Sequence, residues 1–170
     1  MAPKLSFEIP PVRLGLYAIL TLFSLILFCL TATRLHYTNT NLNFYESYAA
    51  ELIFTGLVTM IWCIFVILAM FKRFEFRFIT TFLGEIVVLV ILWFFWVVGA
   101  GIASTSWAGI DNCQQFEACR VLSALLAFAW LSWITLTALL IVTVLFSVAN
   151  HALQQPLHGR WDPRISAYSA

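Results

Sequence analysis

Residues 78–103 read FITTFLGEIVVLVILWFFWVVGAGIA, an apolar run in which Glu85 is the only charged residue. At about 1.5 Å of rise per residue, a helix of this length extends about 39 Å, which exceeds the roughly 30 Å hydrocarbon thickness of a bilayer. Three more apolar stretches, at 14–33, 52–71 and 121–149, contain no charged residue, so 16 of the 17 charged residues lie outside the four stretches. Each stretch is long enough to cross a membrane.

The composition agrees with this interpretation. The chain is 62% hydrophobic and 10% charged, whereas a soluble domain has about 45–50% apolar and about 25% charged residues. Near-continuous apolar runs, without the alternation of barrel strands, predict helices, because a helix satisfies its own backbone polar groups in lipid. The sequence therefore predicts an all-α membrane protein, a bundle of four transmembrane helices. A net charge of +1 gives no basic surface for nucleic acid.

The basic residues predict how the bundle is oriented, because Lys and Arg accumulate in cytosolic loops. One side of the predicted membrane carries Lys4, Arg13, Lys72, Arg73, Arg77, Arg160 and Arg164, and the other carries Arg34 and Arg120. Both termini are therefore expected in the cytosol. We expect residues 34–51 and 104–120 to form loops on the exterior or lumenal side.

This orientation divides the chain into three parts. Residues 1–13 form a cytosolic amino-terminal segment, residues 14–149 form the transmembrane domain, and residues 150–170 form a flexible cytosolic tail with two prolines. The four spans are expected at about 14–33, 49–71, 78–103 and 121–149.

The four cysteines fall into two groups. Cys113 and Cys119 share the predicted second exterior loop, where an oxidising compartment favours a structural disulfide between them. No third cysteine and no histidine lies in that loop, so a metal site is not expected there. Cys29 and Cys63 lie inside spans, where a thiol behaves as a small apolar side chain.

Small residues at intervals of four indicate where the third and fourth spans could meet. Gly99 with Ala103 ends the third span, and Ser123 with Ala127 begins the fourth. In lipid, such spacing permits close approach of two helix backbones. We therefore expect contact between these two spans near the exterior face.

Two tryptophan pairs lie at matching depths in these same spans. Trp93 and Trp96 precede the exterior end of the third span by about as much as Trp130 and Trp133 follow that of the fourth. Each pair is spaced i, i+3 and so shares a helix face. We hypothesise an aromatic layer between the two spans; alternatively, the four rings face lipid or neighbouring copies of the chain.

Glu85 is the one acid within an apolar stretch, and ionisable groups in such positions are often functional. It could lie near the cytosolic headgroups beside Arg73 or Arg77, or it could form an intramembrane site. The sequence offers no paired carboxylates, catalytic triad, phosphate loop or metal-ligand cluster, so we expect no catalytic residue, no cofactor and no enzymatic activity.

Taken together, four spans, two cytosolic termini and a cysteine pair ahead of an aromatic, alanine-rich fourth span resemble the MARVEL-domain tetraspan proteins, in particular the fungal members. The likeness is sharpest between Phe94 and Trp133, through Phe94–Ser104, Asn112–Arg120 and Ser123–Trp133. Claudins, with a tryptophan and a cysteine pair in the first exterior loop, and tetraspanins, with a larger second loop, fit less well.

The resemblance implies a non-enzymatic protein of the plasma membrane or of endomembranes and vesicles. Such a protein would organise membrane patches or take part in vesicle trafficking, and its partners would be membrane lipids, with sterols a possibility, further copies of the chain or other membrane proteins. The alternative function is a small channel or transporter, or an accessory subunit of one, that uses the intramembrane acid Glu85.

Overall fold

The computed structural model describes residues 9–41, 47–72, 81–106, 115 and 117–149. These residues form four helices: α1 (Ile9–Asn41), α2 (Ser47–Lys72), α3 (Phe82–Ser106) and α4 (Glu117–Ala149). All four are long and apolar enough to cross a membrane. The described part of the chain thus confirms a helical protein with four helices that are able to span a membrane, while the side of the membrane on which the termini lie stays a prediction.

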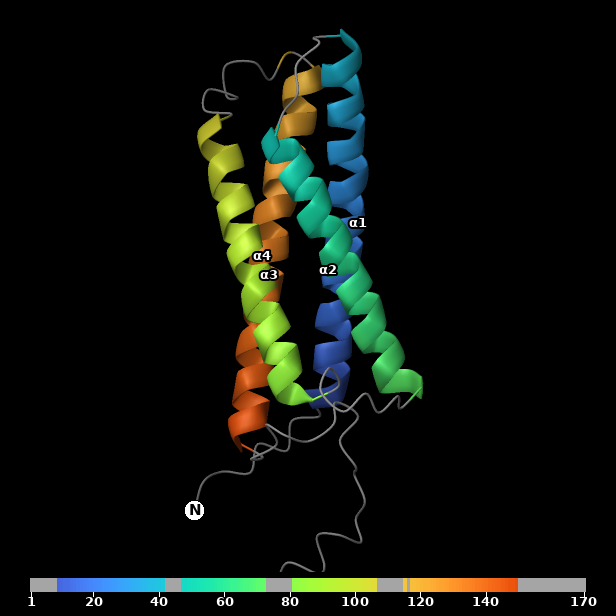
Figure 1. Ribbon diagram of the computed structural model, residues 1–170, viewed down its shortest axis with the longest axis vertical. Coiled ribbons are helices and arrows are strands. Elements are labelled where there is room, and N and C mark those ends of the chain that lie inside the picture. Colours follow the sequence, from blue (N-terminus) through green and yellow to red (C-terminus); the bar gives the residue numbers. More distant parts are fainter. Residues whose placement is uncertain (1–8, 42–46, 73–80, 107–114, 116, 150–170) are drawn as a thin grey trace, which may run out of the picture.

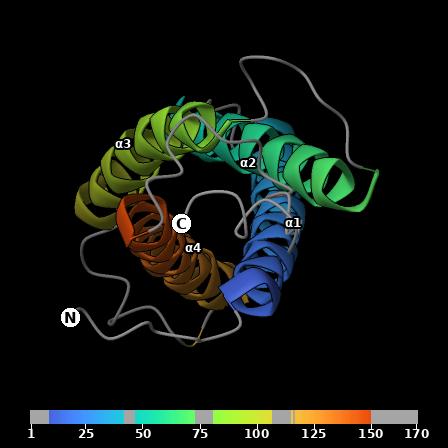
Figure 2. The same ribbon diagram turned by 90° about the horizontal axis from the view of Figure 1, so that it is seen from below.

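The helices run antiparallel in chain order and form a single closed bundle (Figure 1). Seen from below, α1 lies between α2 and α4, and α3 completes the ring (Figure 2). The first residues of α1 and α3 and the last residues of α2 and α4 share one end of the bundle, which we name the termini end. The opposite end is the far end.

Three helices, α1, α2 and α4, are longer than the spans that the sequence predicted. The expected first exterior loop, residues 34–51, is largely helical, because α1 continues to Asn41 and α2 begins at Ser47. The hydroxyls of Thr38 and Thr40 donate hydrogen bonds to the carbonyl oxygens of Arg34 and His36, at 3.0 and 2.6 Å. These threonines satisfy their side chains within the helix, so the polar sequence there does not require a loop.

The core side of each helix repeats in steps of three and four residues. Apart from glycines, the buried positions are Arg13, Tyr17, Leu20, Ser24, Leu27, Thr31 and Thr38 in α1; Ala49, Leu52, Thr55, Thr59, Cys63, Val66 and Ala69 in α2; Phe82, Glu85, Leu89, Leu92, Trp96, Ala100 and Ala103 in α3; and Leu122, Leu125, Ala129, Ser132, Leu136, Leu139, Thr143 and Ser147 in α4. This is the spacing of left-handed helix packing, the usual arrangement in membrane bundles.

The bundle has an apolar outer surface, as lipid surroundings require, and a core in which several polar side chains are buried among apolar ones. Large apolar side chains cover its outer surface, among them Phe54, Ile61 and Phe94. Several buried hydroxyls donate to the carbonyl one turn earlier, as Thr31, Thr59 and Ser132 do at 2.7–2.8 Å. These internal bonds lower the cost of keeping hydroxyls away from water.

Gly56 marks the close approach of α1 and α2. A Cβ at this position would lie 3.5 Å from a methyl carbon of Leu27 and 3.6 Å from the carbonyl oxygen of Ser24. Those distances are ordinary van der Waals contacts, so a methyl group fits there but a larger side chain does not.

The effect of a substitution at Gly56 on the stability of the bundle should therefore depend on the size of the new side chain. We expect Gly56→Ala to be neutral or to stabilise the bundle by up to about 1 kcal/mol, because alanine favours a helix over glycine. Gly56→Leu should destabilise it by about 1–3 kcal/mol, because the added atoms overpack the contact. Unfolding in mixed micelles, followed by tryptophan fluorescence, measures both.

Gly15→Leu is the matched control, because a Cβ on Gly15 meets nothing within 4 Å. Equal losses at the two glycines would contradict the packing assigned to Gly56.

Candidate functional site

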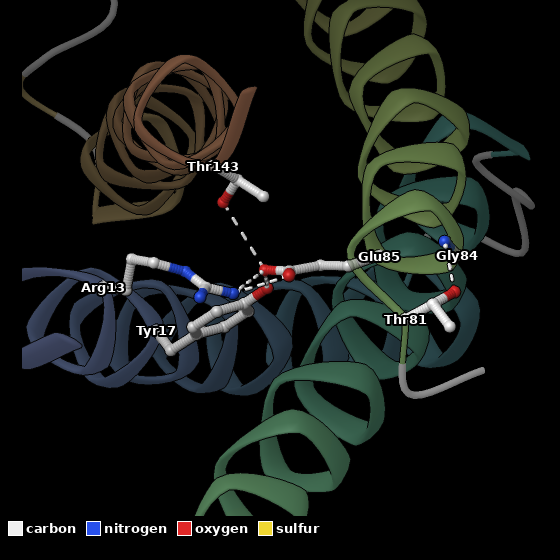
Figure 3. Close-up of polar contacts among 6 residues, drawn as sticks. All are labelled: Arg13, Tyr17, Thr81, Gly84, Glu85 and Thr143. Atoms are coloured by element: carbon white, nitrogen blue, oxygen red, sulfur yellow. Dashed lines mark hydrogen bonds and ion pairs between the residues drawn. The ribbon is translucent and has the colours of Figure 1, made fainter. Parts of the chain in front are cut away.

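A buried ion pair joins α1 to α3 near the termini end (Figure 3). One terminal nitrogen of Arg13, Nη2, donates to both carboxylate oxygens of Glu85, at 2.7 and 2.6 Å. Glu85 is fully buried and the Arg13 side chain is 4% exposed. Two opposite charges are thus enclosed in the apolar bundle, with no net charge between them.

Two hydroxyls complete the surroundings of the carboxylate. Tyr17, one turn after Arg13, donates its phenolic proton to Oε1 of Glu85. Thr143 of α4 lies at the limit of hydrogen-bond distance from the same oxygen, at 3.5 Å. Glu85 therefore receives contacts from α1 and α4 and connects three of the four helices (Figure 3).

The beginning of α3 positions the carboxylate. The Thr81 hydroxyl accepts a hydrogen bond from the amide of Gly84 at 3.3 Å, which is an N-cap contact. The Thr81 carbonyl accepts the amide of Glu85 at 3.0 Å and so closes the first helical turn. The positive end of the α3 dipole adds a favourable field for a negative side chain placed there.

Phe82 positions the arginine. The guanidinium carbon of Arg13 lies 4.9 Å from the centre of the Phe82 ring, a cation–π distance. The Phe82 ring packs in turn against Phe146 of α4, with 5.4 Å between ring centres. The cation is therefore held between an aromatic face and a carboxylate, while its Nε atom is buried without a hydrogen-bond partner.

The sequence analysis named Arg73 and Arg77 as possible neighbours of Glu85, with an intramembrane site as the alternative, but it did not name Arg13. Within the described residues the partner is Arg13, and Arg73 and Arg77 lie outside them. Arg13 had been assigned to the segment before the first span, yet it lies inside α1 and is buried. A signal was available, because both residues stand about one turn inside the start of parallel helices and therefore share a depth.

The tryptophans form only part of the expected layer between α3 and α4. The Trp93 and Trp133 rings lie 5.6 Å apart, and Trp130 packs edge-on against Trp133 at 5.6 Å. Trp93 donates to the Thr137 hydroxyl and Trp130 to the Ser104 hydroxyl, at 3.0 and 3.2 Å. These contacts tie the two helices together at the depth that the sequence indicated.

Trp96 does not join this layer. It is fully buried in the bundle core, where its indole donates to the Thr59 hydroxyl of α2 at 3.0 Å. Three positions along a helix rotate a side chain by about 60° from its neighbour, enough to direct Trp93 to α4 and Trp96 to α2.

The small residues are likewise divided among several contacts. Ala103 is fully buried, and the Ser123 hydroxyl donates to the Cys119 carbonyl at 3.1 Å. Ala127 faces outward, contrary to an expected role in packing within the chain. Gly99 faces α2 rather than α4, because a Cβ there would lie 2.5 Å from a carboxylate oxygen of Glu51.

Glu51 is a second acid within a span, at the far end of α2, and the sequence analysis missed it. Its carboxylate rests in the space left by the missing side chain of Gly99. The Oε2 atom of Glu51 is buried and has no hydrogen-bond partner. The residue directly precedes the apolar stretch that begins at 52, so a charge-free window stopped just short of it.

The predicted disulfide stays a prediction. Cys113 lies outside the described residues, and Cys119 lies in the first turn of α4. Cys29, on the outer face of α1, and Cys63, in the core, are free thiols.

Comparisons with known proteins add no family to these observations: no family model, no curated protein and no solved structure matched the chain. The resemblance to MARVEL-domain proteins therefore also stays a prediction. Within the described residues, no three His, Cys, Asp or Glu side chains are grouped as a metal site would require.

Removing one partner of the ion pair should cost far more than removing both. We expect Glu85→Ala to destabilise the bundle by about 3–5 kcal/mol, because it leaves the Arg13 charge buried and unpaired. The double variant Arg13→Leu with Glu85→Leu should lie much closer to the wild type, because no charge then remains. Denaturant unfolding in detergent, compared as a double-mutant cycle, measures the difference.

Thr143→Val serves as the control, because its long contact with Glu85 predicts a loss below about 1 kcal/mol. Additive losses for Arg13 and Glu85 would show that the pair does not act as a unit.

Proposed function

We propose that this protein is a non-enzymatic membrane organiser: a four-helix bundle that associates with copies of itself and with lipids to form membrane patches or to take part in vesicle trafficking. The observation that carries the proposal is the contrast between a closed core and an open outer surface. The core is filled by large side chains with no exposure, including Tyr17, Trp96 and Leu136. The outer surface is long, apolar and available to lipid or to another helix.

The ion pair and the aromatic contacts at the termini end support a bundle with a fixed shape. Arg13 and Glu85 hold α1 and α3, and Phe82 extends the contact to α4 through Phe146. The tryptophans hold α3 to α4 toward the far end. A bundle that is fixed near both of its ends presents a constant outer surface, which suits a protein that associates with lipids and with other protein chains.

Two small residues on that surface favour self-association through α3 and α4. A Cβ on Gly101 would meet nothing within 4 Å, and Ala127 of α4 is exposed. Neither side chain fills space within the chain. In lipid, small outward residues allow a second helix to approach closely, and close approach is the main source of association there.

The alternative, a small channel or transporter for ions or solutes, has less support. It would use Glu85 at a pathway through the bundle, but Arg13 and Tyr17 already occupy the carboxylate. Flux of inorganic ions through the purified protein in liposomes, abolished by Glu85→Gln, would favour the alternative over the organiser.

Self-association provides the direct test of the organiser. We expect Gly101→Leu to weaken association by about tenfold in the dissociation constant, equivalent to roughly 1.4 kcal/mol, because the new side chain separates the helices. Single-molecule photobleaching in bilayers of defined protein density gives the number of chains per spot.

Gly15→Leu is the matched control, since Gly15 is also open to the outside but lies on α1. A wild-type chain that stays single at all densities, or equal effects at Gly15 and Gly101, would contradict assembly through α3 and α4.

A further inference from the structure

A groove lies on the outer surface of the bundle between α1 and α2, toward the far end. Positions 32, 35, 36 and 39 of α1 follow the i, i+3, i+4, i+7 spacing of one helix face, and position 28 lies one turn before them. The groove therefore follows α1 for about 16 Å along its axis. It has a volume of about 400 Å³ and is lined by Phe28, Ala32, Leu35, His36 and Asn39 of α1 and by Ile53 of α2.

The crossing of α1 and α2 explains where the groove ends. Gly56 of α2 faces Leu27 and the Ser24 carbonyl of α1 in close contact. Leu27 precedes the groove residues of α1, and Gly56 follows Ile53 in the antiparallel α2, so this contact bounds the groove on the side of the termini end. On the other side of the crossing the groove continues to the far end.

The lining changes from apolar to polar along the depth of the membrane. Its four apolar residues are half-buried, whereas His36 and Asn39 are exposed. The apolar span of α1 extends from Pro11 to Thr40, so the polar pair lies at the end of the span, where the headgroups begin. This order matches a lipid whose chain lies in the groove and whose polar group lies at the far end.

The polar pair favours an uncharged lipid head that donates hydrogen bonds. The lining contains no Asp, Glu, Lys or Arg, so no charge in the groove pairs with a phosphate. Within the described residues, the His36 and Asn39 side chains form no hydrogen bond with the protein. Each of these two side chains has an acceptor as well as a donor, since a neutral imidazole has one unprotonated nitrogen and a carboxamide has one oxygen.

From this order of apolar and polar groups we propose that the groove binds ceramide. One of its chains lies along Phe28, Ala32 and Leu35, and its amide and hydroxyl groups lie at His36 and Asn39. The amide N–H and the hydroxyls of ceramide supply donors for both acceptors of the polar pair. As the identity of a lipid partner, this inference rests on the proposed membrane organiser.

The polar groups, and not the chain, decide which lipid is selected. A chain that enters the groove exchanges one apolar environment for another, because lipid tails are as apolar as leucine. A head that displaces water from His36 and Asn39 must replace the hydrogen bonds that the water made. Phosphatidylcholine has no hydrogen-bond donor, and a sterol or a diacylglycerol has a single hydroxyl, so each leaves at least one of the two acceptors without a partner.

The test uses the full chain in phosphatidylcholine liposomes that contain ceramide with a photoactivatable diazirine in its acyl chain. Peptide mass spectrometry after illumination locates the labelled residues, which we expect within 28–39 and around Ile53. Ala32→Phe should lower the labelling by about tenfold, because the added ring fills the groove. Asn39→Leu should lower it by about fivefold, because the side chain keeps its size but loses the amide.

Ala18→Phe and Thr33→Val are the matched controls. Ala18 and Thr33 are exposed on α1 but do not line the groove. The first variant adds the same ring, and the second removes a polar group that bonds to its own helix, at 2.8 Å. Both should label within about twofold of the wild type. Circular dichroism and elution volume confirm the fold of each variant.

Unlabelled lipids test the choice of ceramide. An excess of unlabelled ceramide should suppress the labelling, whereas the same amount of cholesterol or of a diacylglycerol should leave it within about twofold. Equal suppression by cholesterol or by the diacylglycerol would overturn the assignment to ceramide. Equal labelling of Ala32→Phe and Ala18→Phe would overturn the site itself, because it would indicate general contact with the bilayer.

Counting chains per spot in bilayers of the same composition separates this site from the organiser. Ala32→Phe should leave assembly unchanged, because α1 and α2 lie across the ring of helices from α3 and α4 (Figure 2). Assembly without selective labelling contradicts only the ceramide site. Selective labelling of chains that stay single contradicts only the assembly of the organiser.

Discussion

The cost of leaving a polar group without a partner in lipid governs this bundle more than the burial of apolar surface does. Lipid tails are as apolar as leucine, so apolar contacts alone give four helices little reason to choose one arrangement. Arg13 and Glu85 supply a reason, because separating them would leave two charges in a medium that cannot solvate them. Their pairing fixes the rotation and depth of α1 relative to α3.

The other buried hydroxyls in the core form hydrogen bonds of two kinds, within one helix or between two helices. The hydroxyls of Thr31 and Ser132 donate to backbone carbonyls of their own helices, so these bonds do not constrain the neighbouring helices. Thr59, by contrast, also accepts the Trp96 indole from α3. Bonds of the first kind make hydroxyls tolerable inside the bundle, and bonds of the second kind make the arrangement of helices specific.

The sequence predicted features of single helices, such as the position of each span, but missed features that depend on how two helices are rotated relative to each other. Charge-free length placed the four spans, and a count of depth placed Trp93 opposite Trp133. Rotation about the helix axis is not visible in such counts, so Trp96 was assigned to the wrong neighbour. Arg13 and Glu85 are 72 positions apart, and their pairing required both the depth and the rotation of two helices that are not consecutive.

The two buried acids differ in whether their carboxylate oxygens have hydrogen-bond partners. Glu85 is saturated by Arg13 and Tyr17, whereas Oε2 of Glu51 has no partner. α2, which carries Glu51, takes no part in the ion pair and inclines away from α3 toward the termini end (Figure 1). Movement of α2 would therefore displace Glu51 without breaking the Arg13–Glu85 ion pair.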